Sequence, residues 1–212
     1  MKKKLFILIV LLFTVIGFSQ VIQNTNPKQK TTQKPKPAQS QAKANKVKTQ
    51  PKEQTPDTVI KWYTFQEAII LNKQNPKKIL IDLYTDWCGW CKRMDAVTFT
   101  NKVIAKYMNT HYYCVKFNSE RKDTIIFKEA TYINPNPTVP RSAHQLAITL
   151  VKGQLSYPNF VFMDESMNVI QNVPGYHPPS EFEAIMKFFG EDAYKKQDFE
   201  SFKNSFVKEI KE

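Results

Sequence analysis

Two cysteines separated by two residues, Cys88 and Cys91, are the side chains best suited to do chemistry in this chain of 212 residues. They follow a continuous apolar stretch and are expected to open a helix. At a helix start, unpaired backbone N–H groups and the helix dipole favour a thiolate and lower a thiol pKa from ~8.5 to roughly 3.5–7.5. We therefore expect Cys88 to be an exposed nucleophile. Cys91, nearly one turn later and more buried, would close or resolve a disulfide with it.

The alternative interpretation of such a pair is half of a zinc site, which needs two more ligands at suitable spacing. The remaining candidates, none of which forms a ligand-spaced pair, are Cys114, His111, His144 and His177. Covalent haem attachment is excluded by pattern because Lys92, and not a histidine, follows the second cysteine. We therefore expect redox chemistry with no metal or other cofactor, and an inert, buried Cys114.

The elements that position the pair are predicted from caps and apolar patterns. Thr64 and Glu67 form a capping box that opens a helix ending before Asn75. Residues 78–84 are predicted to form a strand buried on both faces, immediately before the cysteines. The turn that joins this strand to the helix would place Cys88 at the helix start.

Further elements are predicted along the rest of the chain. Strands are expected over residues 112–117, 159–163 and 169–173, a possible hairpin over 124–127 with 131–133, and helices over 103–108 and 143–152. A second capping box, Ser180 with Glu183, is expected to open a helix that runs through residue 188. Strands alternating with helices predict an α/β domain with a mixed central β-sheet flanked by helices.

Residues 79–94 resemble the active-site strand and helix of thioredoxins, and the resemblance extends over residues 62–189. In particular, the chain resembles exported thioredoxin-domain proteins of Bacteroidetes-type bacteria. The resemblance implies a thioredoxin-like fold and thiol–disulfide oxidoreductase activity. It further implies protein disulfides or dithiols as substrates, and a protein that donates or accepts electrons.

The same resemblance implies roles for individual residues. Asp82 matches a buried aspartate that accepts the proton of the second cysteine, and Lys116 matches the lysine beside that aspartate. Pro158 matches a cis-proline in the loop that faces the disulfide, and Gly175 matches a glycine after the last hairpin strand. The expected substrate contacts are Trp87, Gly89, Trp90 and Tyr157.

Elementary electrostatics supports a role for Asp82. A buried carboxylate without a partner costs several kcal/mol, so an aspartate in an apolar strand needs a reason to be there. Burial is expected to raise its pKa and allow proton exchange with Cys91, whereas a charged Lys116 nearby would moderate that rise. Lys116 could instead be a strand lysine that points to solvent.

The chain departs from thioredoxins in two places. Trp90 replaces the usual proline before the second cysteine, and residues between the cysteines tune the redox potential. Because Gly89 and Trp90 offer no charge to hold a thiolate, we expect a reductase or isomerase and not a strong oxidant. The second departure is an enlarged insertion, residues 119–157, expected near the rim of the active site. It either recognises a partner protein or only decorates the fold. The alternative function is a redox-inert binding or assembly module that holds a partner with this insertion.

The ends of the chain are expected to differ from the domain. Residues 1–19 have the basic start and the apolar run of a secretory signal peptide, with an uncleaved anchor as the alternative. Residues 20–57 are a polar linker rich in Lys, Pro, Gln and Thr, expected to be disordered. Residues 58–212 remain as the domain, and its C-terminal extension, 191–212, carries an aromatic stripe expected to pack within the molecule. The mature protein would be periplasmic or secreted, with no membrane span.

The net charge of +12 does not indicate nucleic-acid binding. Three lysines at the N-terminus and eight in the linker carry most of it, and the predicted domain is nearly balanced. Such a domain has an ordinary solvated surface and no compositional support for a nucleic-acid partner.

Overall fold

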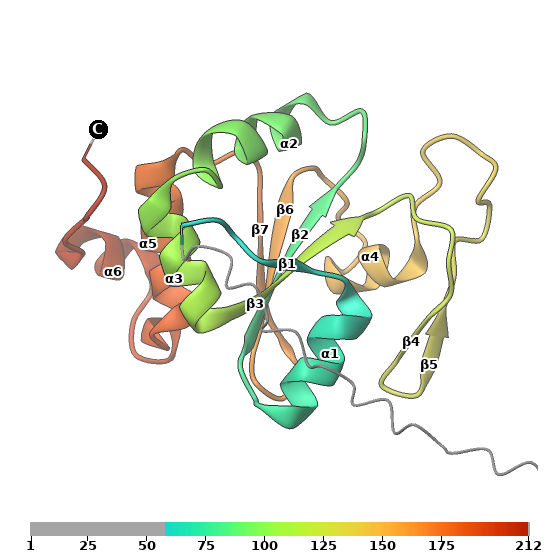
Figure 1. Cartoon of the computed structure of the whole chain (residues 1–212), viewed down its shortest axis with the longest axis horizontal. Coiled ribbons are helices and arrows are strands. Elements are labelled where there is room, and N and C mark those ends of the chain that lie inside the picture. The colour runs from blue at the N-terminus through green and yellow to red at the C-terminus, as the bar shows by residue number, and fades with distance from the viewer. Residues whose placement is uncertain (1–57, 212) are drawn as a thin grey trace, which may run out of the picture. The chain divides into compact units, whose positions relative to one another are not determined.

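A five-stranded mixed sheet forms the centre of the domain (Figure 1). This computed structural model describes residues 58–211 of the chain. The strands, in their order across the sheet, are β1 (Trp62–Tyr63), β3 (Tyr112–Asn118), β2 (Lys78–Tyr84), β6 (Asn159–Met163) and β7 (Val169–Pro174). β1 and β2 are parallel to β3, and β6 is antiparallel to both β2 and β7. The predicted mixed sheet is thus confirmed. The short edge strand β1 was not predicted.

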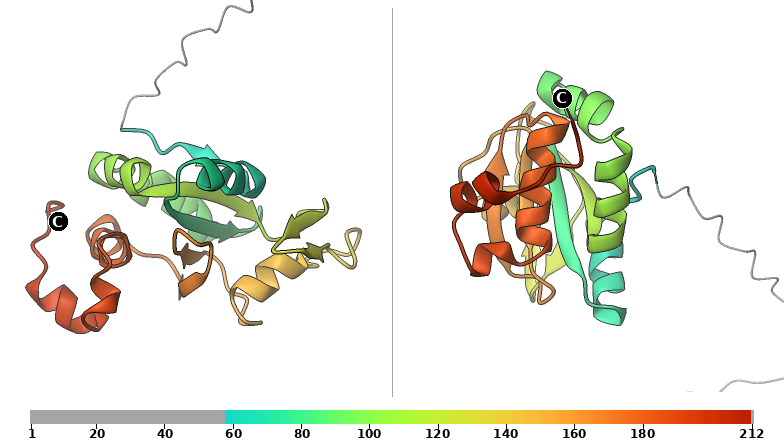
Figure 2. Two further views of the ribbon diagram at one scale, coloured as in Figure 1. Left: turned by 90° about the horizontal axis from the view of Figure 1, so that it is seen from below. Right: turned by 90° about the vertical axis from the view of Figure 1, so that its left-hand side faces the viewer.

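Helices cover both faces of the sheet. They are α1 (Phe65–Gln74), α2 (Gly89–Arg93), α3 (Lys102–His111), α4 (Gln145–Leu150), α5 (Pro179–Gly190) and α6 (Phe199–Ser205). A π-helical turn, η1 (Met94–Thr98), continues α2, and a 3₁₀ turn, η2 (Ala193–Lys195), follows α5. Figure 2 shows α1 and α4 on one face of the sheet, with α3 and α5 on the other.

Strand β2 contributes to two separate cores because its side chains alternate between the faces of the sheet. Ile79, Ile81 and Leu83 pack in the core that contains α1 and α4. Leu80 belongs to the opposite core, with α3, α5 and Met94 of η1. Asp82, two residues after Leu80, therefore points toward the face covered by α2 and α3.

The first predicted capping box is confirmed. The Thr64 hydroxyl accepts a hydrogen bond from the Glu67 N–H at 3.2 Å, and the Glu67 carboxylate accepts one from the Thr64 N–H at 2.8 Å. These contacts satisfy two backbone donors that a helix start leaves open. They fix the beginning of α1 beside the edge strand β1.

The second predicted capping box, Ser180 with Glu183, is wrong. Helix α5 begins at Pro179, where proline's fixed φ suits the first turn, so Ser180 lies inside the helix. Glu183 is fully buried and accepts hydrogen bonds from the backbone N–H groups of Glu209 and Ile210, each at 3.0 Å. A contact with the distant C-terminal segment thus replaces the local cap.

The insertion, residues 119–157, contains the predicted hairpin, formed by β4 (Ile125–Phe127) and β5 (Ala130–Tyr132). Its helix α4 is shorter than the predicted range 143–152. His144 caps the N-terminus of α4, where its ring nitrogen accepts the Leu146 N–H at 3.2 Å. The helix ends before Lys152 and Gly153, both of which have positive φ.

The C-terminal extension packs on α5, as predicted. Its aromatic stripe joins the core that includes Phe188 and Phe189, and the rings of Phe188 and Phe202 lie 5.3 Å apart. The expected signal peptide and linker lie outside the described residues, as does residue 212. None of the helices within residues 58–211 has the length and apolar character needed to cross a bilayer.

Candidate active site

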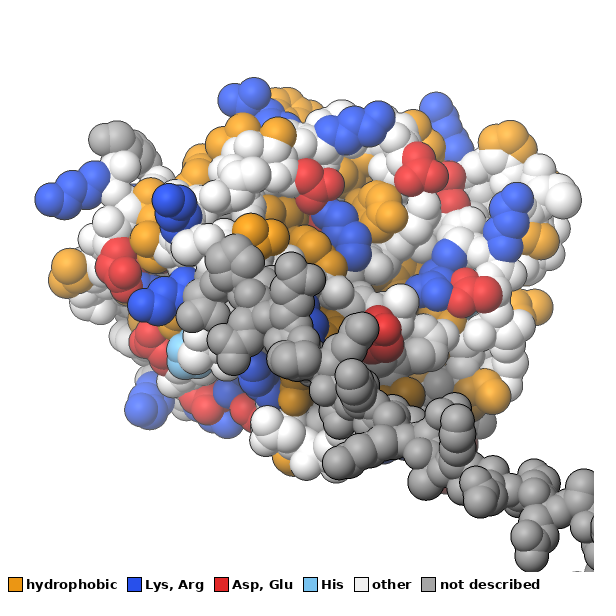
Figure 3. All heavy atoms as spheres, in the orientation of Figure 1, with side chains coloured by type: hydrophobic (Ala, Val, Ile, Leu, Met, Phe, Trp, Pro, Cys, Tyr) orange, Lys and Arg blue, Asp and Glu red, His pale blue; other side chains and the backbone are white. Residues whose placement is uncertain are grey.

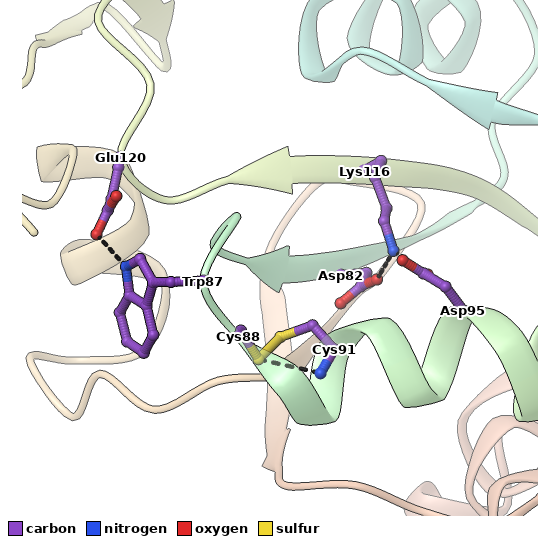
Figure 4. Close-up of a disulfide and its surroundings, with 7 residues drawn as sticks. All are labelled: Asp82, Trp87, Cys88, Cys91, Asp95, Lys116 and Glu120. Carbon is purple, nitrogen blue, oxygen red and sulfur yellow. Dashed lines mark hydrogen bonds and ion pairs between the residues drawn. A yellow bond between two sulfur atoms is a disulfide. The ribbon is translucent and has the colours of Figure 1, made fainter.

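Cys88 and Cys91 form a disulfide at the start of α2 (Figure 4). Cys88 is the N-cap residue of this helix, and its sulfur accepts a hydrogen bond from the Cys91 N–H at 3.0 Å. The sequence forms this turn because the buried strand β2 ends at Tyr84 and the backbone tightens at Thr85, whose carbonyl accepts the Cys88 N–H. Backbone donors of the helix start therefore face the sulfur that would carry the thiolate after reduction.

The expected exposure of Cys88 is wrong. Cys88 is 5% exposed and Cys91 is 2% exposed, so the expected order holds but both residues are buried. Cys88 is covered because its side chain turns into the first turn of α2 to bond with Cys91. The neighbouring aromatic side chains take the exposed positions, with Trp87 at 52% and Trp90 at 59%. Gly89, between the cysteines, is also exposed.

An ion pair between a buried aspartate and a partly buried lysine joins β2, the strand that leads to the disulfide, to its neighbour β3. Asp82 of β2 and Lys116 of β3 are paired residues in the parallel register, and the Lys116 ammonium lies 2.6 Å from Asp82 Oδ2. Asp82 is 1% exposed, and its Oδ1 has no hydrogen-bond partner within residues 58–211. Figure 4 shows the carboxylate between Lys116 and the turn of α2 that carries Cys91.

Burial dominates the titration of this pair. Desolvation raises the pKa of Asp82 from 3.8 to about 6, the attraction and hydrogen bond of Lys116 lower it, and the negative charge of Asp95 raises it further. For Lys116, burial lowers the pKa, but the attraction of Asp82 and the hydrogen bonds of both aspartates outweigh it, so the pKa is raised. Asp82 thus changes its protonation state near neutrality while Lys116 keeps its charge.

Asp95 completes this cluster and was missed in the sequence. It lies on η1, one turn after Cys91, and its carboxylate bonds to the Lys116 ammonium on the side away from Asp82. The available signal was an acidic residue four positions after the second cysteine, on the same helical face. Its pairing could not be predicted because the turn is π-helical, a form common at functional sites but rare in helices generally.

The Tyr157–Pro158 peptide bond is cis, the geometry that the family resemblance implies. The Pro158 carbonyl accepts a hydrogen bond from the Gly175 N–H at 2.8 Å, which joins this loop to the end of β7. Gly175 has a φ of +96°, a conformation that residues with a Cβ rarely adopt. The Tyr157 ring packs edge-on against Trp87, with ring centroids 5.9 Å apart.

Residues of the insertion hold Trp87 in place, as expected for a segment at the rim of the site. The indole N–H donates to the Glu120 carboxylate at 2.8 Å, as Figure 4 shows. The Arg141 guanidinium lies over the same ring, 5.0 Å from its centroid. Trp90 instead packs on Tyr176 after β7, with ring centroids 5.3 Å apart.

Cys114 is separate from this site. It is fully buried in strand β3, and burial raises the pKa of its thiol, which makes it unreactive. Within residues 58–211, no group of three or more His, Cys, Asp or Glu side chains is arranged to hold a metal ion.

The thioredoxin-like domain family matches residues 65–190, more than half of the chain. The chain therefore belongs to this family, whose fold it has. Membership and the disulfide together support thiol–disulfide exchange as the chemistry of the site. No curated protein sequence matches the chain.

Three solved structures illustrate the likeness of fold. The oxidoreductase DsbH is 18% identical, with 70% of this chain and 94% of that chain covered at a TM-score of 0.45. A thioredoxin-fold protein from Helicobacter pylori is 19% identical in sequence. The match covers 70% of this chain and 86% of that chain, with a TM-score of 0.49. A thioredoxin from Thermus thermophilus is 15% identical in sequence. The match covers 64% of this chain and 88% of that chain, with a TM-score of 0.46. At these values of identity and TM-score, the assignment to the family rests on the match to the family over residues 65–190.

Proposed function

We propose that the protein reduces or isomerises disulfides of protein substrates through Cys88 and Cys91. The observation that carries this proposal is the disulfide at a helix start with the buried carboxylate of Asp82 on the adjoining strand. A structural disulfide needs no titrating group beside it, whereas a catalytic pair needs a base for its second thiol. The buried Asp82, with a pKa of about 6, is suited to that task at neutral pH.

The reaction proceeds in two exchanges. The Cys88 thiolate attacks one sulfur of the substrate disulfide, which forms a mixed disulfide and releases the other substrate sulfur as a thiolate. The Cys91 thiol then gives its proton to Asp82, and the resulting thiolate attacks the Cys88 sulfur. This step forms the Cys88–Cys91 disulfide and releases the second substrate sulfur, which takes up a proton. Two electrons pass from protein to substrate, and a dithiol partner must return them.

The residues between the cysteines support the proposed direction of electron flow. The residues between the cysteines, Gly89 and Trp90, are uncharged. Lys116, the partly buried cation beside Asp82, is engaged by Asp82 and Asp95. A strong oxidant needs its thiolate stabilised so far that the reduced form is favoured. The absence of a charged residue between the two cysteines supports a reductase or isomerase instead.

Trapping of the mixed disulfide tests this proposal. The Cys91→Ser variant, incubated with a disulfide-bonded protein such as insulin, should accumulate a covalent adduct on Cys88 that dithiothreitol removes. The Cys88→Ser variant is the matched control and should form none, and after reduction Cys88 should be alkylated faster than Cys91 or Cys114. If both cysteines can be replaced by serine while a partner is still bound, and the wild-type protein reduces no disulfide, the redox-inert binding module is the correct function.

We further propose that the protein acts outside the cytoplasm, in the periplasm or as a secreted protein. The support is the basic, apolar and then polar order of residues 1–19, typical of a signal peptide. Intact-mass analysis of protein from the native host should show a mature chain that begins near Gln20. A full-length chain held in the membrane fraction would indicate an anchored protein.

A further inference from the structure

Two arginines at the rim of the disulfide have no carboxylate partner within residues 58–211. Arg141, from the insertion, lies over the Trp87 ring, and Arg93, on α2, lies over the Tyr176 ring with 5.6 Å to its centroid. Both arginines are exposed. Neither takes part in any of the ion pairs formed by the described residues.

The acidic side chains around the disulfide keep their charge, but they accept hydrogen bonds from groups other than the two arginines. Glu120 accepts the Trp87 indole N–H, and Asp86 accepts the Asn118 amide at 3.1 Å. Asp95 bonds to Lys116, as described above. The guanidinium groups of Arg93 and Arg141 are therefore left to interact with a ligand or with water. Lys92, next to Cys91, and Lys122, which lines a hollow together with Arg141 and Glu120, are also exposed.

The fold places the two arginines on different sides of the cysteine loop. Arg141 belongs to the insertion, which follows β3, whereas Arg93 packs on Tyr176, two positions after β7. β2, which leads to Cys88, lies between these strands in the sheet. Figure 3 shows lysine and arginine side chains along the upper edge of this face, above the end of β2.

Contact with an aromatic ring suits these arginines to a specific type of ligand. Neither guanidinium takes part in an ion pair of the described residues, and its fork of N–H groups matches a carboxylate in a bidentate arrangement. Packing over a ring restricts each side chain, so less side-chain entropy is lost when the carboxylate binds. Trp87 and Trp90, each more than half exposed, offer apolar contact beside the same groups.

We propose that the substrate or redox partner is a protein segment with acidic residues on both sides of its reactive cysteine, received by Arg141 and Arg93. This inference rests on the proposed function and adds the class of substrate. It also gives the insertion a role, because Arg141 is one of its residues and Glu120, another, holds the ring beneath it.

Reduction of three matched peptides tests the inference. Each peptide is a disulfide-linked dimer with one cysteine per chain, flanked on both sides by Glu, by Gln or by Lys. The fully reduced protein is mixed with excess peptide and the product thiol is followed in a single turnover. Each rate is divided by the rate with dithiothreitol, which removes differences in intrinsic reactivity. The acidic peptide should react about fivefold faster than the neutral one at low salt, and the ratio should fall toward one in ~0.5 M salt.

Variants assign the preference to the two residues. The Arg93→Gln/Arg141→Gln double variant should reduce the ratio of acidic to neutral rates to about one. The Lys73→Gln/Lys106→Gln variant, which removes the same charge from exposed positions on α1 and α3, should keep it. Peptides with glutamate on only one side of cysteine should each depend on one arginine.

The outcomes separate this inference from the function on which it rests. Equal rates for acidic and neutral peptides, or a preference that survives the double variant, would overturn the acidic partner and leave the redox function intact. Faster reaction of the Lys peptide would overturn it as well. If no peptide is reduced, the redox function is contradicted, and this inference with it.

Discussion

Asp82 is the residue whose burial links the chemistry of the site to the stability of the fold. Its carboxyl is 1% exposed, pairs with Lys116 at 2.6 Å and has a pKa of about 6. The same desolvation that makes it a useful base near neutral pH makes its charged form costly. Its effects on rate and on stability should therefore be opposite in sign.

The first prediction concerns the rate. Below pH 6 Asp82 holds a proton and cannot take one from Cys91, so resolution of the mixed disulfide should speed up as pH rises through about 6. The Asp82→Asn variant should be about 10²-fold slower at pH 7 and lack this step, since a general base contributes about 10²–10⁴-fold. Single-turnover insulin reduction from pH 5 to about pH 8 measures both the rate at pH 7 and the rise of the rate with pH. The exposed Asp123→Asn variant is the control, and an unchanged profile in Asp82→Asn would refute the assigned base.

The second prediction concerns stability. Folding raises the pKa of Asp82 from 3.8 to about 6. Between pH 3.8 and about pH 6, therefore, the folded state keeps a proton on Asp82 that the unfolded state has lost. The free energy of unfolding of the wild type should thus fall as pH rises through this window. Asparagine mimics the protonated form, so Asp82→Asn should match the wild type near pH 4. At pH 7 it should be more stable by up to about 3 kcal/mol. Urea unfolding at the two pH values measures this, and a less stable variant at pH 7 would contradict it.

The site residues were predictable to different degrees. Asp82 and Lys116 stand in local patterns that match a known family, so the sequence alone was sufficient to propose them. Asp95 joins them only through the π-helical turn, and Arg141 reaches Trp87 only through the fold of the insertion. Such contacts depend on long-range packing, which a one-dimensional pattern does not contain.

At the scale of elements, a buried carboxylate on α5 binds the end of the C-terminal extension, in addition to the aromatic packing described above. Glu183 of α5 accepts the N–H groups of Glu209 and Ile210 and pairs with Lys187 at 2.9 Å. Burial raises its pKa, but these hydrogen bonds and the attraction of Lys187 outweigh it, so the pKa is lowered. The contact should hold above pH 4.5, which is the ordinary pKa of a glutamate carboxyl. It should weaken at lower pH, as the carboxylate takes up a proton.

The third prediction follows from this contact. Glu183→Gln should lower the free energy of unfolding by about 1–3 kcal/mol, because it removes a charged acceptor from two backbone donors and from buried Lys187. Hydrogen exchange of the Glu209 and Ile210 amides should become faster. The exposed Glu200→Gln variant should change neither the free energy of unfolding nor the hydrogen exchange of these amides. If the two amides stay protected in Glu183→Gln, another contact holds the extension.

Two similar motifs show why element boundaries were predicted unevenly. Thr64 and Glu67 cap α1 because nothing else competes for the helix start. Ser180 and Glu183 have the same spacing, but Pro179 starts α5 earlier and the C-terminal segment claims the glutamate. A local motif therefore predicts a boundary well only where no distant backbone group needs the same side chain.

At the scale of the whole molecule, the sheet apart from the edge strand β1 was predictable because its strands follow the hydrophobic pattern. The continuous apolar run of β2 requires cover on both faces, and the helices before and after it supply that cover. Residues 119–157 connect β3 to β6, and residues 191–211 follow α5, so neither segment interrupts the five-stranded sheet. The sheet thus holds Cys88, Asp82 and Lys116 together, while the insertion shapes the rim.

The reduction potential of the Cys88–Cys91 couple tests the central claim most directly. Equilibration in glutathione or dithiothreitol buffers, followed by alkylation and intact-mass analysis, counts the free thiols at each potential. A reductase or isomerase should show one two-electron transition between about −270 and −180 mV, the range from thioredoxin to disulfide isomerase. A couple near −120 mV would show a strong oxidant. A disulfide that stays closed below about −300 mV would be structural and would contradict the redox function.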